Sequence, residues 1–212
     1  MIRIKQFVFN SFQVNCYLLT NELNQGIIID PACDSKQERD TLFDYIFDNN
    51  ITIIKIIITH AHVDHITGLK PTLDKFNKPV TMHKNDSFLL DNAKELGAMY
   101  GFNIEAIDKS MQFIEEGENI QFGSSELEIM HIPGHSPGSI IIYSSNDKFA
   151  ITGDVLFCGS IGRTDLPGGD YDTLIEGIKT KLLNLASDTV VYCGHGPSTI
   201  IEQEKKTNPF LV

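Results

Sequence analysis

The hydrophobic and polar positions along the chain form two kinds of pattern, one typical of β-strands and one typical of α-helices. The strand pattern is the more frequent. Near the amino terminus, runs rich in β-branched residues predict strands over Ile2–Phe9 and Val14–Thr20, and a third strand that ends at Ile29–Asp30. Their composition is typical of half-buried strands. A more continuous apolar run predicts a buried strand over Ile53–Thr59.

The strand pattern recurs in the carboxyl-terminal part of the chain. Four further strands are expected at Leu127–Ile132, Ile140–Tyr143, Phe149–Thr152 and Thr189–Cys193. No proline-rich linker or low-complexity tract separates these strands from the earlier ones. The pattern therefore favours one compact domain over two.

Helical spacing of apolar residues appears in two places. Ser35 and Glu38 form a candidate capping box before the first of them. Its apolar positions are Leu42, Phe43, Ile46 and Phe47. A second helix is expected over Thr173–Leu185, with Thr173 and Glu176 as its capping box. Strands and helices mixed in this way predict an α/β protein whose sheets are covered by helices.

Histidine and aspartate residues gather just past the carboxyl ends of the predicted strands. The stretch IIITHAHVDHITG, from Ile56 to Gly68, places three histidines and one aspartate directly after a buried strand. Single residues of the same two types follow three later strands. The whole set is His60, His62, Asp64, His65, His135, Asp154 and His195. Because loops at strand ends converge into ligand sites in layered α/β proteins, we expect these residues to form one site.

Neutral imidazole and carboxylate groups are ligands that suit zinc, iron and manganese. His60 and His62 would point the same way from a locally extended backbone. Asp64 and His65, displaced by the following turn, would face a second ion. Asp154 could bridge both ions, because a carboxylate has two oxygens. With His135 and His195, this set predicts a centre of two divalent metal ions, each with an open position for water.

Composition and charge exclude several other classes of function. The chain has 212 residues and a formal net charge of -11, which disfavours nucleic acids and anionic membranes as partners. It has no apolar run of roughly 18 residues, and the stretch MIRIKQFVF lacks the features of a signal peptide. Four widely spaced cysteines are expected to stay reduced and to pack as small hydrophobic residues: Cys16, Cys33, Cys158 and Cys193. We therefore expect a cytoplasmic protein. The sequence leaves its oligomeric state open.

At the proposed metal-binding residues, the sequence resembles the metallo-β-lactamase fold superfamily. Within this superfamily it resembles the glyoxalase II-like, or hydroxyacylglutathione hydrolase-like, proteins. The resemblance is greatest to a group of short bacterial members. The resemblance runs through Cys16-Tyr17-Leu18, Ile29-Asp30-Pro31, THAHVDH, IPGHSPGS, TGDVLFCGSIGRTDLPGGD, CGHGP and the TNPF ending. It implies an αββα sandwich, with the metals at one edge between the sheets. Residues 1–212 would form this single domain, without the carboxyl-terminal helical domain of glyoxalase II proper.

The resemblance also assigns roles to individual residues. It places His60, His62 and His135 on the first metal, Asp64, His65 and His195 on the second, and Asp154 between them. It gives Arg163 a role in binding a substrate carboxylate, whereas an ion pair with Asp165 or Asp170 is the structural alternative. His83 and His131 lack ligand-like neighbours in the sequence, and we expect no metal there.

These features predict a metal-dependent hydrolase of small thioesters. Two bound cations, with zinc expected and iron or manganese as alternatives, would supply a bridging hydroxide at neutral pH. Asp64 and Asp154 would act as catalytic residues by holding these metals. One alternative is a persulfide dioxygenase with a single iron, and another is a non-catalytic metal-binding protein. β-Lactamase activity is not expected, because the β-lactam-cleaving members commonly carry cysteine on one metal where this chain has aspartate in TGD.

Overall fold

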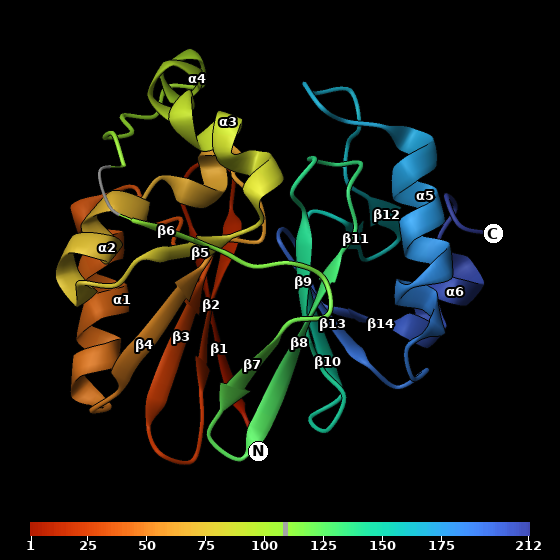
Figure 1. Ribbon diagram of the computed structural model, residues 1–212, viewed down its shortest axis with the longest axis horizontal. Helices are drawn as coiled ribbons and strands as arrows, with labels where there is room; N and C mark the ends of the chain where they lie inside the picture. Colours follow the sequence, from red (N-terminus) through yellow and green to blue (C-terminus); the bar gives the residue numbers. More distant parts are fainter. Residues whose placement is uncertain (108–109) are drawn as a thin grey trace.

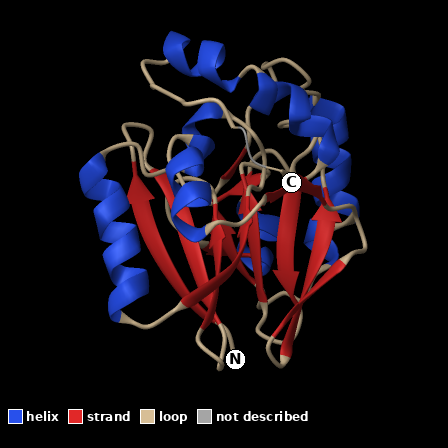
Figure 2. Ribbon diagram, turned by 60° about the vertical axis from the view of Figure 1, so that its left-hand side comes forward, coloured by secondary structure: helices blue, strands red, loops and turns tan. Residues whose placement is uncertain are grey.

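The computed structural model describes residues 1–107 and 110–212. Two sheets pack face to face, and helices cover the outer face of each (Figure 1). Seen from another side, the helices again lie outside the layers of strands (Figure 2). This is the αββα sandwich that the sequence predicts, in a single domain. In the part of the chain that is described, no helix is both long and apolar enough to pass through a membrane.

The first sheet changes from antiparallel to parallel pairing along its width. The antiparallel strands are β1 (Arg3–Phe9), β2 (Val14–Thr20) and β3 (Gln25–Ile29). The strands that continue the sheet in parallel from β3 are β4 (Thr52–Ile57), β5 (Val80–Met82) and β6 (Met111–Phe113). The strand order follows the sequence, and the connections from β3 to β4 and from β4 to β5 each include a helix that lies against the outer face of the sheet.

The second sheet has the order β14-β13-β10-β9-β8-β7. Its strands are β7 (Asn119–Phe122), β8 (Ser125–His131), β9 (Ile140–Ser144), β10 (Phe149–Gly153), β13 (Val190–Cys193) and β14 (Thr199–Ile200). β9 pairs antiparallel with both β8 and β10, and β10 pairs parallel with β13. The strands β8, β10 and β13 therefore end at the same edge. A small hairpin, β11 (Leu156–Phe157) and β12 (Ser160–Ile161), follows β10.

Helices occupy three positions around the sheets. α1 (Lys36–Asp48) and α2 (Leu69–Phe76) lie against the first sheet, and α5 (Tyr171–Thr180) and α6 (Ile201–Thr207) lie against the second (Figure 1). The short helices α3 (Ser87–Asp91) and α4 (Ala93–Met99) lie over the upper edge of the sandwich in this view. The strand ends that carry the candidate site meet at that edge.

Alternate residues of the central strands enter different layers of the core. Ile27 and Ile29 pack between the two sheets, whereas Ile28 packs toward α1 and α2. Likewise, Ile140 and Ile142 face the first sheet. The expectation of half-buried strands is wrong for β2, all of whose residues are buried, and for most of β3. The reason is that the second sheet covers one face of these strands and other elements cover the opposite face.

The predicted helix starts have different outcomes. The capping box of Ser35 and Glu38 is present at the start of α1. The prediction of a capping box at Thr173 and Glu176 is wrong. α5 begins earlier, because Asp170 is the N-cap residue and its side chain accepts a hydrogen bond from the Thr173 amide at 2.7 Å. α5 also ends at Thr180, and a separate 3₁₀ turn follows it. Most of the remaining short elements, including α2, α3, α4 and α6, were not indicated by the hydrophobic pattern.

The cysteines only partly follow the expectation. Cys16, Cys33 and Cys193 are buried free thiols in the core, as expected. Cys158 is also free, but it is exposed. The expectation of packing as a small hydrophobic residue is therefore wrong for Cys158, which lies in the turn between β11 and β12.

A buried carboxylate fastens the last helix to the second sheet. Glu204 on α6 is fully buried. One of its oxygens accepts from the Thr199 hydroxyl at 2.6 Å, and the other accepts from the Gly159 amide at 2.9 Å and the Asn208 side chain at 2.8 Å. These bonds join α6 to β14 and to the β11–β12 turn.

Replacing Glu204 with Ala leaves these three donors without their acceptor. We expect the free energy of unfolding to fall by about 2–4 kcal/mol. Glu202, an exposed residue of the same helix that pairs with Lys206, is the matched control, and Glu202→Ala should change stability by less than about 0.5 kcal/mol. Urea unfolding followed by circular dichroism measures both variants. Equal, small effects would contradict a stabilising role for the buried carboxylate.

Candidate metal centre

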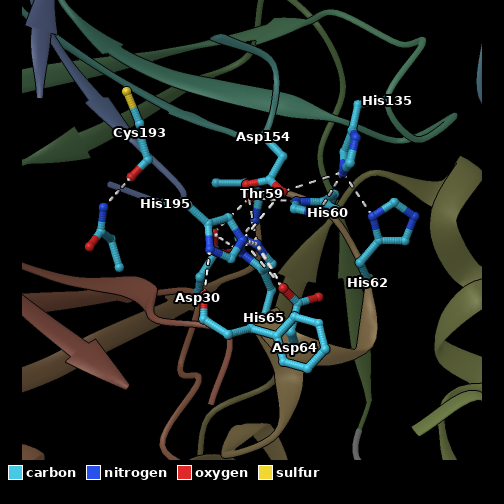
Figure 3. Close-up of polar contacts among 12 residues, drawn as sticks. Asp30, Thr59, His60, His62, Asp64, His65, His135, Asp154, Cys193 and His195 are labelled. Atoms are coloured by element: carbon cyan, nitrogen blue, oxygen red, sulfur yellow. Dashed lines mark hydrogen bonds and ion pairs between the residues drawn. The ribbon is translucent and has the colours of Figure 1, made fainter. Parts of the chain in front are cut away.

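The seven residues that the sequence predicts as metal ligands lie together at one edge of the sandwich (Figure 3). They follow the carboxyl ends of β4, β8, β10 and β13, and two of them lie in the 3₁₀ turn Val63–Ile66. Strands of both sheets contribute, so the group lies between the sheets. The structure thus brings together residues that are far apart in the sequence.

His60, His62 and His135 form a first group of ligand atoms. Nδ1 of His62 is 2.8 Å from Nε2 of His135, which in turn is 3.2 Å from Nε2 of His60. His60 and His135 are buried, and His62 is partly exposed. Three imidazole nitrogens are thus turned toward one point, which is the arrangement that a divalent transition metal requires.

Asp64, His65 and His195 form a second group. Nε2 of His195 lies 3.3 Å from Nε2 of His65 and 3.3 Å from an oxygen of Asp64. An oxygen of Asp64 also lies 3.8 Å from Nε2 of His65. Two imidazoles and one carboxylate therefore converge beside the first group.

Asp154 lies between the two groups. One of its oxygens is 3.3 Å from Nε2 of His65, and the other is 3.6 Å from Nε2 of His135 and 3.5 Å from Nε2 of His195. The carboxylate is therefore in reach of ligands from both groups. This is the position that a bridging ligand would occupy.

Hydrogen bonds to Nδ1 orient four of the five histidine rings. The Nδ1 atoms of His65 and His195 face a carboxylate oxygen of Asp30 and the carbonyl oxygen of Phe12, each at 3.0 Å. Nδ1 of His135 faces the carbonyl oxygen of Arg163 at 2.8 Å. Because Nδ1 is held by a protein acceptor in each case, Nε2 is left to face the centre of the group.

Asp30 orients two rings from beneath the site. It accepts hydrogen bonds from the backbone amide and the hydroxyl of Thr59, both at 2.7 Å. The Thr59 hydroxyl oxygen is in turn 3.0 Å from Nδ1 of His60, so it can accept from that ring. Asp30 therefore orients His65 directly and His60 through Thr59. Asp30 was not among the predicted site residues, although it follows the end of β3 just as the ligands follow other strand ends.

Asp86 joins the two loops that carry the first group. Its carboxylate is buried and accepts from the amide of Ala61 at 2.9 Å, the hydroxyl of Ser136 at 2.8 Å and the amide of Gly138 at 2.5 Å. Ala61 lies between two ligand histidines, and Ser136 follows His135. No sequence signal pointed to Asp86, since its partners are distant along the chain.

Gly194, the first glycine of the CGHGP motif, lies too close to two site residues to carry a side chain. A Cβ atom at Gly194 would lie 2.1 Å from an oxygen of Asp154 and 2.9 Å from the ring of His65. Any side chain here would displace the central carboxylate. The motif therefore requires glycine for space beside the site.

Burial and local charge give the two groups opposite protonation properties. Burial lowers the pKa of His62 to about 3, and the neighbouring His135 acts in the same direction. Burial lowers the pKa of His60 and His135 as well. For His195, burial acts against protonation, but hydrogen bonds to Asp154 and Asp64 outweigh it and raise the pKa to about 9. The first group is therefore neutral and ready to bind a cation at pH 7.

The donors of the site fit a pair of metal ions. Among the described residues, the buried Oδ1 atom of Asp154 has no hydrogen-bond partner, although Nε2 of His65 lies 3.3 Å from it. Unpaired buried polar atoms are costly and call for an explanation such as an ion. The donor set of imidazole and carboxylate is also the set that divalent transition metals prefer. We therefore find that the residues present suit two cations.

Arg163, which the sequence predicts to bind a substrate carboxylate, pairs with a neighbouring acid. The Arg163 side chain forms a bidentate ion pair with Asp165, with both N···O distances 2.7 Å, while its carbonyl orients His135. The structural alternative for this side chain, an ion pair with Asp165, is thus present, and binding of a substrate carboxylate stays a prediction.

His83 and His131 stack on each other, with ring centroids 3.9 Å apart. Neither belongs to a group of possible metal ligands within the described ranges.

Comparison with known proteins agrees with this geometry. The profile of the Metallo-beta-lactamase superfamily matches residues 10–195 of this chain. The hydroxyacylglutathione hydrolase GloC of Haemophilus influenzae is 39% identical over 203 residues, which are 95% of this chain and 94% of that protein.

Solved structures share the whole fold. The BLEG-1 B3 metallo-beta-lactamase has a TM-score of 0.89 at 34% identity, over 99% of this chain and 100% of that one. TTHA1623, solved in a di-iron-bound form, has a TM-score of 0.88 at 33% identity, over 98% of this chain and 100% of that one. Sequence profile, relatives and fold agree, and the chain belongs to the metallo-β-lactamase superfamily.

Proposed function

We propose that this protein is a hydrolase of small thioesters that uses two divalent metal ions. The observation that carries the proposal is the pair of ligand groups around Asp154, at the floor of a pocket large enough for a small molecule. His60, His62 and His135 would hold one ion, and Asp64, His65 and His195 the other. Asp154 would contact both.

Two bound cations would supply a nucleophilic hydroxide at neutral pH and polarise the carbonyl of the substrate. The residues of the chain hold and orient the ligands for this chemistry. Asp64 and Asp154 contribute negative charge, and Asp30 and Asp86 fix the loops behind the rings. Of the described pocket residues, Asp64 and Asp154 are the carboxylates at the floor, and both serve as ligands in this assignment. No separate acid is left there to protonate a leaving group.

A thioester suits a site of this kind. A thiol has a pKa near 8.5 in solution, so a thiolate leaves without a strong general acid. The similarity to the hydroxyacylglutathione hydrolase of Haemophilus influenzae supports the same substrate class. The similarity to TTHA1623, solved in a di-iron-bound form, supports iron as a candidate metal beside zinc, since this ligand set suits both.

Two alternatives predict different behaviour. A persulfide dioxygenase would use a single iron and consume oxygen, and a non-catalytic metal-binding protein would turn over nothing. The second ligand group beside the first favours two ions over a single iron. The pocket that reaches residues of both groups favours an enzyme over a non-catalytic metal-binding protein. Similarity to a B3 metallo-beta-lactamase makes β-lactam hydrolysis a necessary control in any assay.

The first prediction tests the reaction. The metal-loaded protein should hydrolyse thioesters of N-acetylcysteamine and glutathione, and treatment with a chelator should abolish turnover and leave circular dichroism largely unchanged. The fold should persist because the ligands lie past the strand ends, on loops and one 3₁₀ turn, whereas the apolar layers are formed by the strands and helices. Thiol release measures the reaction, with a β-lactam and a persulfide as control substrates. Oxygen uptake with the persulfide and no thioester turnover would contradict the proposal.

The second prediction concerns the sharing of Asp154. The purified protein should bind two metal ions per chain by elemental analysis. Asp154→Ala should lose most of both ions, whereas His62→Ala should mainly lose one, because Asp154 lies in reach of both groups. His131→Gln, outside the ligand groups, is the control and should retain both. Equal retention in the Asp154 and His62 variants would contradict a bridging role.

The third prediction concerns Asp86. Asp86→Asn replaces an acceptor oxygen with a donor opposite a backbone amide or the Ser136 hydroxyl, so the two loops should separate. We expect metal affinity to fall about 10- to 100-fold, as for other residues that orient ligands. Competition with a chromophoric chelator measures it. Asp91→Asn, an exposed change on α3, is the matched control. Unchanged affinity in a folded Asp86→Asn protein would remove Asp86 from this role.

A further inference from the structure

The pocket above the metal-binding residues has mostly apolar walls. Its volume is about 430 Å³, within the range of about 300–1,000 Å³ typical of small-molecule sites. The apolar side chains come from α3, α4, the β1–β2 turn and the loop after β12. They include Phe12, Phe88, Leu96, Tyr100, Leu166 and Pro167.

Three aromatic rings of this wall remain exposed. Phe12, Phe88 and Tyr100 keep 44%, 43% and 47% of their surface accessible. The rings of Phe12 and Tyr100 meet edge to face, with centroids 6.2 Å apart. Exposed apolar groups gathered around one cavity are typical of a surface that a ligand covers. Because the cavity continues down to His62 and Asp154, the ligand would be the substrate itself.

The charges of the wall disfavour an anion. Apart from histidine, Arg163 is the single cation among the described lining residues, and Asp165 already occupies its guanidinium group. Glu95 on α4 adds a carboxylate to the same wall. A negatively charged group placed here would lose water without gaining a free cationic partner, which is unfavourable.

We infer that the substrate places an uncharged, apolar acyl group, an aliphatic chain or an aromatic ring, against this wall. The inference rests on the proposed thioester hydrolysis and specifies its acyl group. The thioester carbonyl lies at the floor, near His62 and His135, and the acyl group extends between α3, α4 and the Phe12 turn. Glu95 rejects acyl groups that end in a carboxylate.

A series of N-acetylcysteamine thioesters tests this inference with one constant, neutral thiol. From acetyl to hexanoyl, kcat/KM should rise between about tenfold and two-hundredfold, since each buried methylene contributes up to about fourfold. Adipoyl, which has the same number of carbons as hexanoyl but ends in a carboxylate, should be at least about tenfold slower than hexanoyl. Acetyl turnover shows whether the protein is a thioesterase at all.

Two variants test whether the pocket wall causes the dependence of kcat/KM on acyl length and on acyl charge. Phe88→Ala should lower the hexanoyl-to-acetyl ratio of kcat/KM by about three- to tenfold, because it removes part of the apolar wall. Glu95→Gln should raise the adipoyl-to-hexanoyl ratio several-fold, because it removes the like charge. Phe47→Ala, an equally apolar change on exposed α1, is the control and should leave both ratios unchanged. Thermal unfolding confirms that each variant is folded.

Binding gives a readout independent of turnover. A ketone analogue of the hexanoyl thioester, with a methylene between carbonyl and sulfur, should bind with a negative heat-capacity change, and Phe88→Ala should weaken it. If acetyl is hydrolysed but hexanoyl gains nothing, or adipoyl is preferred, the apolar acyl group is refuted while thioester hydrolysis stands. If no thioester is hydrolysed, the proposed function and this inference both fail.

Discussion

The structure depends on hydrogen bonds that hold histidine rings from behind. Four rings of the centre present Nδ1 to an acceptor: the Thr59 hydroxyl, Asp30, the Arg163 carbonyl and the Phe12 carbonyl. Each bond fixes the ring so that Nε2 faces the neighbouring ligands. Without these acceptors, the rings could rotate and turn Nε2 away from the other ligands. The surrounding fold provides each acceptor at a fixed place.

The αββα sandwich meets this requirement through the ends of its strands. β4 in the first sheet and β8, β10 and β13 in the second bring their following loops to one edge. The inner faces of the sheets are filled by isoleucine and other apolar residues, so the strands are rigid and the loops start from fixed positions. Buried carboxylates then tie loop to loop, as Asp86 does for the loops of Ala61 and Ser136. Rigid strands and bonded loops together position a polar site between two apolar layers.

Much of this could be predicted from the sequence, because its signals are local. Continuous apolar runs identified the central strands, and the histidines and aspartates that follow them identified all seven residues that the structure brings together. Signals that depend on distant partners could not be found in this way: Asp86 binds groups about fifty positions away, and the role of the Arg163 carbonyl depends on His135. The start of α5 was misplaced because Thr173 and Asp170 are both good capping residues, and the backbone of the preceding loop decides between them. The apolar wall of the pocket was also missed, since its residues come from separate short elements.

In a dinuclear centre, the two ligand groups would hold two separate ions on either side of Asp154. Anomalous diffraction from crystals of the metal-loaded protein, recorded on both sides of the metal absorption edge, tests this most directly. We predict two anomalous peaks, one among His60, His62 and His135 and one among Asp64, His65 and His195, with Asp154 contacting both. A single peak at full metal loading, or peaks away from these side chains, would contradict the account.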